Sequence, residues 1–129
     1  MIVLDEQIHK DQGELLQSWH FPVRQIGFDV GYAGMKDDQI ITLLHSFRHS
    51  TLFTRDADFY KPRLRHNRYC IVYLDIEKIK VAEYARKVLR HPDFNTEAKR
   101  LGYLLRAAPD GLTIWEPSAE HSVFLKWLG

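Results

Sequence analysis

The chain has 129 residues, with 18 lysine and arginine residues against 17 aspartate and glutamate residues, and a formal net charge of +1. Its composition, 45% hydrophobic and 27% charged, is typical of one folded domain and excludes a disordered chain. The single cysteine, Cys70, excludes an intramolecular disulfide and argues against a cysteine-based zinc site. No apolar stretch is long enough to cross a bilayer, so we expect a cytoplasmic protein with no membrane partner.

Strands and helices alternate along the first half of the chain. A buried strand is expected over residues 1–5, a helix over 12–19 and a half-buried edge strand over 25–30. An amphipathic helix follows over 37–47, with the Asp37 and Asp38 pair expected at its N-cap. Short apolar runs over 51–54 and 70–74 predict two further buried strands.

The second half is expected to contain two helices and a closing strand. Residues 79–89 predict an amphipathic helix that ends before Pro92, and a second helix is expected from Asn95 or Thr96 to Leu105. A strand over 111–115 would close the sheet. The apolar residues of the tail, 118–129, fall together on a helix, so this segment either packs on the domain or docks a partner.

The order of these elements predicts the fold class. Buried strands that alternate with helices indicate a single α/β domain with a mostly parallel sheet of about five strands and helices on both faces. Right-handed crossovers place the carboxyl ends of parallel strands along one edge of such a sheet. If the third strand lies beside the first, Asp5 and Asp56 become neighbours at that edge.

Carboxylates follow two of the buried strands, and this pattern indicates a site for a divalent cation. Asp5 ends the first strand, and Asp56 and Asp58 follow the third. Asp37 is expected to join them because it precedes Ile40 by three residues on the core-facing side of its helix, whereas Asp38 lies over a more polar side. Mg²⁺ prefers carboxylate oxygens of this kind as ligands. Each acid taken singly also fits a helix cap or a turn.

Basic residues follow the acid pair closely. A cationic rim beside an anionic pocket suits a substrate that carries phosphates, and a solvated basic loop is the equal alternative. The residues that we expect to hold backbone phosphates are Arg55, Lys61, Arg63, Arg65 and Arg68.

Three segments, in this order, resemble motifs of the small PIN-like nucleases, the class that includes VapC-type toxins. They are Leu4-Asp5-Glu6-Gln7, Asp37-Asp38-Gln39-Ile40-Ile41 and Thr54-Arg55-Asp56-Ala57-Asp58-Phe59. The resemblance covers residues 1–74, and Gln7 stands where many relatives have asparagine.

The resemblance implies a three-layer α/β/α PIN-like domain over residues 1–129 and a metal-dependent endoribonuclease that acts as the toxin of a toxin–antitoxin pair. It implies a catalytic site of Asp5, Asp37, Asp56 and Asp58 that binds Mg²⁺ or Mn²⁺, with Thr54 as a supporting polar residue. The implied partners are RNA and a small antitoxin protein, and a homodimer is left open.

Two other functions compete with this one. A catalytically degenerate PIN-like module would bind nucleic acid or protein without cutting it. A phosphoacceptor signalling domain would also place acids after the first and third strands, at Asp5 and Asp56. Such a domain needs a lysine after its last strand, where this chain has Glu116 and Pro117.

Overall fold

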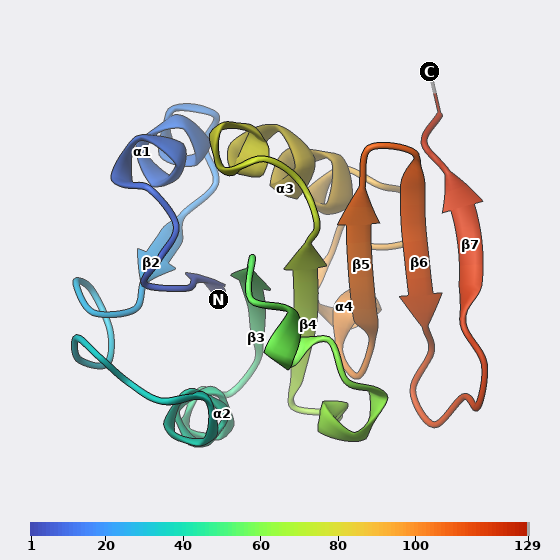
Figure 1. Ribbon diagram of the computed structural model, residues 1–129, viewed down its shortest axis with the longest axis horizontal. Helices are drawn as coiled ribbons and strands as arrows, with labels where there is room; N and C mark the ends of the chain where they lie inside the picture. Colours follow the sequence, from blue (N-terminus) through green and yellow to red (C-terminus); the bar gives the residue numbers. More distant parts are fainter. Residues whose placement is uncertain (129) are drawn as a thin grey trace.

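Seven strands form one sheet in the order β2-β1-β3-β4-β5-β6-β7 (Figure 1). The computed structural model describes residues 1–128. Strands β2 to β5 pair in parallel, and β5, β6 and β7 pair antiparallel. The sheet is therefore mostly parallel, as predicted, but it has seven strands where about five were expected. The strands are β1 (Ile2–Leu4), β2 (Val23–Gln25), β3 (Ser50–Thr54), β4 (Tyr69–Leu74), β5 (Leu104–Ala108), β6 (Gly111–Trp115) and β7 (Val123–Lys126).

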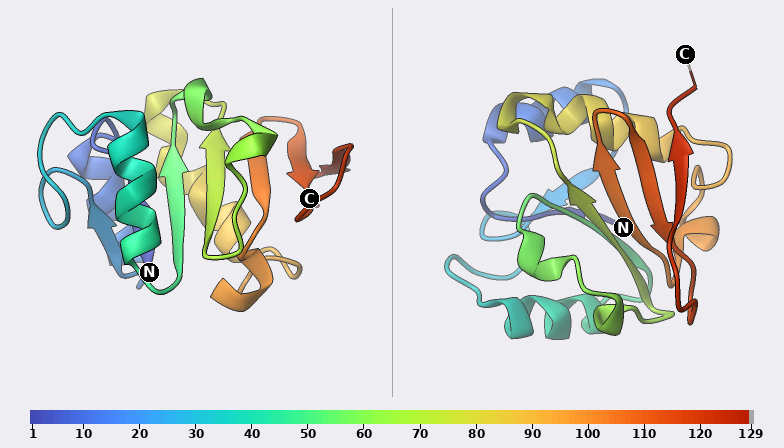
Figure 2. Two further views of the ribbon diagram at one scale, coloured as in Figure 1. Left: turned by 90° about the horizontal axis from the view of Figure 1, so that it is seen from below. Right: turned by 45° about the vertical axis from the view of Figure 1, so that its right-hand side comes forward.

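Helices pack on both faces of this sheet. Figure 2 shows α1 (Lys10–Ser18) and α3 (Val81–Leu89) on one side and α2 (Asp37–Ser46) on the other. A short helix, α4 (Glu97–Arg100), lies behind β5 in Figure 1. Three 3-10 turns complete the described elements: η1 (Ala57–Phe59), η2 (Pro62–Leu64) and η3 (Lys78–Lys80).

The two faces of the sheet build two separate hydrophobic clusters. On the α2 face, Val3 and Leu52 of the sheet pack with Ile40 and Leu44 of the helix. The alternate strand residues, such as Leu4 and Phe53, point to the α1 and α3 face and pack there. Because both faces are covered at the centre of the sheet, β1, β3 and β4 are buried at nearly every position rather than at alternate ones.

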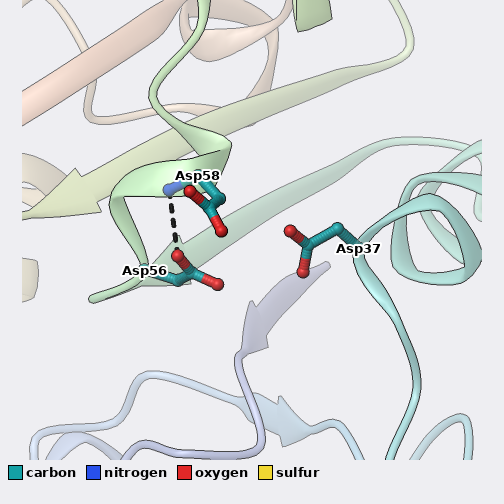
Figure 3. A group of neighbouring side chains, drawn as sticks. All are labelled: Asp37, Asp56 and Asp58. Atoms are coloured by element: carbon teal, nitrogen blue, oxygen red, sulfur yellow. Dashed lines mark hydrogen bonds between the residues drawn. The ribbon is translucent and has the colours of Figure 1, made fainter.

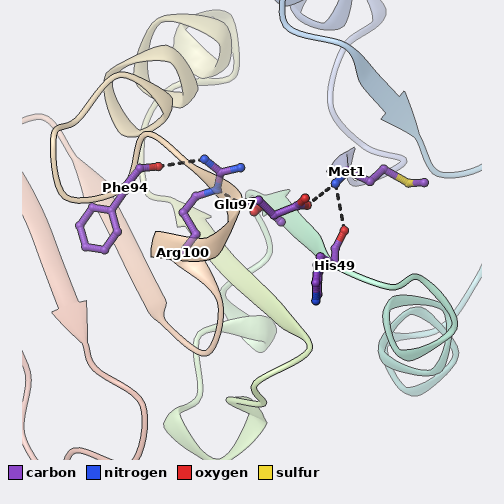
Figure 4. A network of polar contacts seen from close by, with 6 residues as sticks. Met1, His49, Phe94, Glu97 and Arg100 are labelled. Atoms are coloured by element: carbon purple, nitrogen blue, oxygen red, sulfur yellow. Dashed lines mark hydrogen bonds and ion pairs between the residues drawn. The ribbon is translucent and has the colours of Figure 1, made fainter.

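A buried arginine joins α4 to the sheet. Arg100 is only 5% exposed, and its Nε donates to Thr51 Oγ1 at 2.8 Å while its Nη1 donates to the Phe94 carbonyl at 2.8 Å. Glu97, one turn earlier, forms an ion pair with the ammonium group of Met1 (Figure 4). These contacts fix the short helix against the amino ends of β1 and β3.

The prediction of a helix that reaches Leu105 is wrong. The helix ends at Arg100, and Gly102 follows with φ +86°, a left-handed conformation that glycine adopts without strain. Residues from Leu104 onward form β5, where Leu105 and Ala107 are fully buried. Leucine and alanine favour helices in isolation, but pairing with β4 and β6 overrides that preference here.

The helix predicted for the tail is also wrong, although the tail packs on the domain as one of the two alternatives had it. Residues 123–126 form the edge strand β7, so β6 does not close the sheet, and Val123 and Phe124 point to opposite faces. Trp127 packs on the chain itself, because its Nε1 donates to the Ala108 carbonyl at 2.7 Å and its ring lies 6.0 Å from that of Tyr84. Gly129, the last residue of the predicted tail, lies outside the described residues.

Two smaller predictions need correction near the amino end. Strand β2 lies at the sheet edge as expected, but it ends at Gln25 because Gly27 adopts φ +89°, and only a bridge between Ile26 and Val30 follows. Lys36, rather than the acid pair, is the N-cap of α2. Over residues 1–128, no helix has the length and apolar character that crossing a membrane requires.

Candidate metal centre

The carboxyl ends of β1 and β3 lie side by side. The two strands pair in parallel, with Leu4 opposite Phe53, and the backbone N–H of Asp5 continues the pairing by donating to the Phe53 carbonyl at 3.0 Å. The third strand therefore lies beside the first, which is the condition under which the sequence predicts Asp5 and Asp56 to be neighbours. Asp5 and Asp56 follow these strands at the same edge of the sheet, where open α/β sheets bind their ligands.

A buried hydroxyl links Asp5 to Asp56. Thr54 Oγ1 donates to Asp5 Oδ2 at 2.7 Å and accepts a hydrogen bond from the backbone N–H of Asp56 at 3.0 Å. The second oxygen of Asp5, Oδ1, accepts from the Glu6 backbone N–H at 2.7 Å. Both oxygens of this 7% exposed carboxylate therefore have protein partners already. Each oxygen keeps a second lone pair that a further ligand could use.

The protonation of Asp5 reflects its burial. Desolvation raises the pKa of the Asp5 carboxyl above its ordinary value of 3.8, and the negative charges of Asp56 and Glu6 act in the same direction. The hydrogen bonds from Thr54 and from the Glu6 backbone oppose this rise by stabilising the ionised form. A cation nearby would favour the ionised form further.

Three other carboxylates converge beside it. In Figure 3, Asp37, Asp56 and Asp58 point toward one another, and one oxygen of each lies within 4.8 Å of the others. Asp56 Oδ1 accepts from the Asp58 backbone N–H at 2.9 Å, which caps the turn η1 and holds the two acids in fixed relation. This hydrogen bond orders the segment that carries Asp56 and Asp58.

Helix α2 brings the third acid to this pair. Asp37 is the first helical residue, and the buried Ile40 and Leu44 fix that side of the helix on the sheet. The helix start is held by Gln39 Oε1, which accepts from the Lys36 backbone N–H at 2.9 Å. Asp37, as expected from its spacing, lies in the carboxylate group, and Asp38 does not.

Mutual repulsion marks this group as a candidate for a cation. Desolvation raises the pKa of Asp37, and the charges of Asp56, Asp58 and Asp5 raise it further, while Lys61 acts in the opposite direction. Ligand oxygens on opposite sides of one Mg²⁺ lie roughly 4.2 Å apart, twice the ordinary metal–oxygen distance. Oxygens within 4.8 Å of one another are compatible with one hard cation between them, and the all-oxygen donor set suits Mg²⁺ or Mn²⁺.

Gln7 is a neighbour of the site that the sequence did not single out as a site residue. It lines a pocket of about 270 Å³ together with Asp5, Arg55 and Asp56. Its position two residues after Asp5 is the signal that marks it, because the chain turns there at the carboxyl edge of the sheet. The amide of Gln7 can donate or accept a hydrogen bond where a ligand would enter.

Part of the predicted basic group lies beside the acids. Lys61 and Arg63 line a second pocket, of about 250 Å³, with Asp37 and Asp58. Arg55 borders the pocket of Gln7, and its Nε donates to the Ile76 carbonyl at 3.1 Å. These three cations stand where phosphates of a ligand would approach the carboxylates.

Arg65 and Arg68 lie elsewhere. Arg65 donates to the carbonyls of Pro62, at 2.8 Å, and of Glu116, and Arg68 Nη2 donates to the Phe47 carbonyl at 3.5 Å. The physical reason is the topology: between parallel strands β3 and β4 the chain must return from the carboxyl edge of the sheet to the amino edge. Residues late in this connection are therefore carried away from the acids, and the predicted basic group is divided.

Comparison of the chain with models of known protein families, with curated proteins and with solved structures finds no match in any of the three. The protein is thus described by its own fold and site, as an α/β protein with clustered carboxylates at the carboxyl edge of a mostly parallel sheet.

Proposed function

We propose that this protein is a PIN-like, metal-dependent endoribonuclease that hydrolyses RNA phosphodiester bonds with Mg²⁺ or Mn²⁺. The observation that carries the proposal is the convergence of Asp37, Asp56 and Asp58 from two separate elements, with one oxygen of each within 4.8 Å of the others. The helices on both faces of the sheet fit the three-layer PIN-like arrangement, and the site lies at the sheet edge where that family places its acids.

The roles of the residues follow from their positions. The carboxylates of Asp37, Asp56 and Asp58 would hold the cation, and Thr54 would keep Asp5 and Asp56 in register beside it. Bound there, the cation would activate a water and neutralise charge on the phosphate under attack.

The basic side chains beside the carboxylates complete the proposed site. Lys61 and Arg63 would bind the RNA phosphate that lies nearest the acids, and Arg55 would bind the RNA backbone on the side of Gln7. Such contacts provide affinity and register but little reading of base sequence. The resemblance of the sequence supports the toxin of a toxin–antitoxin pair as the setting of this activity, and a small inhibitory protein would then be its partner.

The test is cleavage of a mixed single-stranded RNA pool with Mn²⁺, with Mg²⁺ and with EDTA. Asp56→Asn should lower the metal-dependent rate by at least about 100-fold, because it removes one ligand charge. Asp38→Asn is the matched control: it changes the same chemistry one residue from Asp37, outside the carboxylate group, and should retain activity within a few-fold.

Two outcomes contradict the proposal. Cleavage that persists in EDTA, or that is equal in wild type and Asp56→Asn, would point to a contaminating ribonuclease. Metal binding without cleavage of any RNA would instead support a binding module that has lost catalysis.

A further inference from the structure

One side chain from each of five consecutive strands lines up across the sheet from the carboxylate site. The register pairs Thr54 with Tyr73, Tyr73 with Arg106, Arg106 with Thr113, and Thr113 with Phe124. Directly paired residues project from the same face. We name this set the cross-strand row, and it begins at the threonine that holds Asp5.

The row lies on the α2 face of the sheet. Leu52, Ile71 and Leu104 stand two residues before members of the row, and all three pack in the cluster under α2. Helix α2 and the turn η1 cover the first strands of this face, and the connection through η2 reaches the end of β6, where Tyr60 and Arg65 contact Trp115. In Figure 1, β5, β6 and β7 turn the face to the viewer with no helix of the described chain in front of them.

Aromatic and cationic groups dominate this uncovered surface. Tyr60 stacks on Tyr73, with ring centroids 5.5 Å apart and an angle of 27° between the planes. Phe124 is 45% exposed at the far end of the row, and Lys126 lies on the same face two residues later. Arg106 lies between Tyr73 and Phe124 in the row. Its Nε and Nη2 donate hydrogen bonds to Asp75 Oδ2 at 3.1 Å and 2.5 Å.

Cationic and aromatic side chains also lie together where this surface ends, beside the last residue of β6. The guanidinium of Arg65 lies 5.5 Å from the centre of the Trp115 ring, and Trp115 Nε1 donates to the Tyr60 hydroxyl at 3.1 Å. Arg65 is one of the two basic residues that do not reach the carboxylates, and its position here gives it a place beside the row.

We infer that the cross-strand row is the path along which single-stranded RNA runs to the carboxylate site. Aromatic side chains on an open sheet face bind unpaired bases by stacking, and the cations of Lys126 and Arg65 match the charge of the RNA backbone, whereas the charge of Arg106 is already paired with Asp75. Because Thr54 is buried, the accessible part of the row runs from Tyr73 to Phe124, three strand spacings of about 4.8 Å or roughly 14 Å, enough for a few nucleotides. The inference rests on the proposed nuclease, because the row leads to its site.

Binding measured without catalysis tests the path. The probe is a fluorescently labelled single-stranded RNA of mixed sequence, titrated with protein in EDTA and followed by anisotropy. Phe124→Ala should weaken binding about tenfold, the loss of one base stack. Val123→Ala is the matched control, since Val123 is the adjacent residue of β7, is 53% exposed and projects from the opposite face, and it should change affinity less than twofold.

The charge of the surface has its own readout. Lys126→Gln should reduce the slope of log affinity against log salt by about one, the loss of one phosphate contact. Lys10→Gln, at an exposed position of α1 on the other side of the sheet, should leave the slope unchanged. The same RNA annealed into a duplex should bind more weakly, because its bases are not free to stack.

The result that overturns the path is equal affinity of wild type and Phe124→Ala, equal loss in Val123→Ala, or tighter binding of the duplex. Metal-dependent cleavage with unchanged binding by Phe124→Ala would reject the path and leave the nuclease standing. Specific loss of binding in Phe124→Ala without cleavage by wild type would support the path and reject the nuclease.

Discussion

The hydroxyl of Thr54 serves two carboxylate-bearing segments at once. Thr54 Oγ1 is buried, donates to Asp5 and accepts from the backbone of Asp56, so one side chain sets the distance between the ends of β1 and β3. Burial leaves no water to replace a lost partner. The relative positions of Asp5 and Asp56 therefore depend on this threonine hydroxyl.

Replacing this hydroxyl should show both of its roles. Thr54→Val keeps the shape of the side chain but leaves the buried Asp5 carboxylate and the Asp56 N–H without that partner, so we expect a loss of about 1–3 kcal/mol in the free energy of unfolding. The pKa of Asp5 should rise further, because the Thr54 bond lowers it in the wild type. Urea unfolding and carboxyl NMR titration measure the two effects. Thr54→Ser retains the hydroxyl, and an equal loss in that variant would contradict the argument.

Asp37 makes a separate prediction for pH. Its pKa in the folded protein lies above the ordinary value of 3.8, because of desolvation first and then the charges of Asp56, Asp58 and Asp5. An acid shifted in this direction contributes stability that is fully present below 3.8 and is lost as the pH rises through the raised pKa. In EDTA, Asp37→Asn should therefore raise the melting temperature at neutral pH.

The gain from Asp37→Asn should disappear below pH 3.8, where the wild-type carboxyl is also neutral. Melting curves across this range measure the effect. If the variant is less stable than the wild type at neutral pH without metal, the carboxylates do not repel one another as the geometry indicates.

Among the elements, the edge strand β7 can pair with β6 only because the two backbones approach closely at Gly111. A Cβ atom placed on Gly111 would lie 2.2 Å from the Leu125 carbonyl oxygen and 2.8 Å from the Phe124 ring. The first of these atoms belongs to the backbone, so the pair of strands must separate to accept any side chain. Glycine at this position is what allows β7 to join the sheet.

Gly111→Ala should therefore loosen the last strand selectively. We expect a loss of about 1–3 kcal/mol in stability, as for other substitutions that overfill a packed site. Amide hydrogen exchange should accelerate in β6 and β7, while β1, β3 and β4 keep their protection. Uniform exchange throughout the sheet, or none beyond the wild-type rate, would show that β7 is not held in this way.

At the scale of the whole molecule, the first half of the chain was more predictable than the second. The order of β1, α1, β2, α2, β3 and β4 follows from apolar runs and helical spacing, and the neighbouring of Asp5 and Asp56 follows from parallel pairing. The resemblance to PIN-like nucleases ends at this point of the chain. The short runs that form β1, β3 and β4 pair in one sheet, where both faces of each strand are buried.

The later errors have physical causes that spacing does not reveal. Leu104 to Ala108 has helical propensity and becomes a strand only because β4 and β6 flank it, and the tail forms β7 rather than a helix because it finds an unpaired edge. In the site, Asp37, Asp56 and Asp58 converge as expected. Two features of the site depend on side-chain rotamers and on the path of a loop, which sequence spacing does not fix. They are the hydrogen bonds to both oxygens of Asp5 and the distance of Arg65 and Arg68 from the acids.

A calorimetric titration of the protein with Mn²⁺ tests whether Asp37, Asp56 and Asp58 together hold a divalent cation. We expect saturable binding by the wild type and by Asp38→Asn, and its loss in the double variant Asp37→Asn with Asp58→Asn. Circular dichroism of the double variant checks that it remains folded. Equal binding by the folded double variant, or no binding by the wild type at millimolar Mn²⁺, would contradict the account.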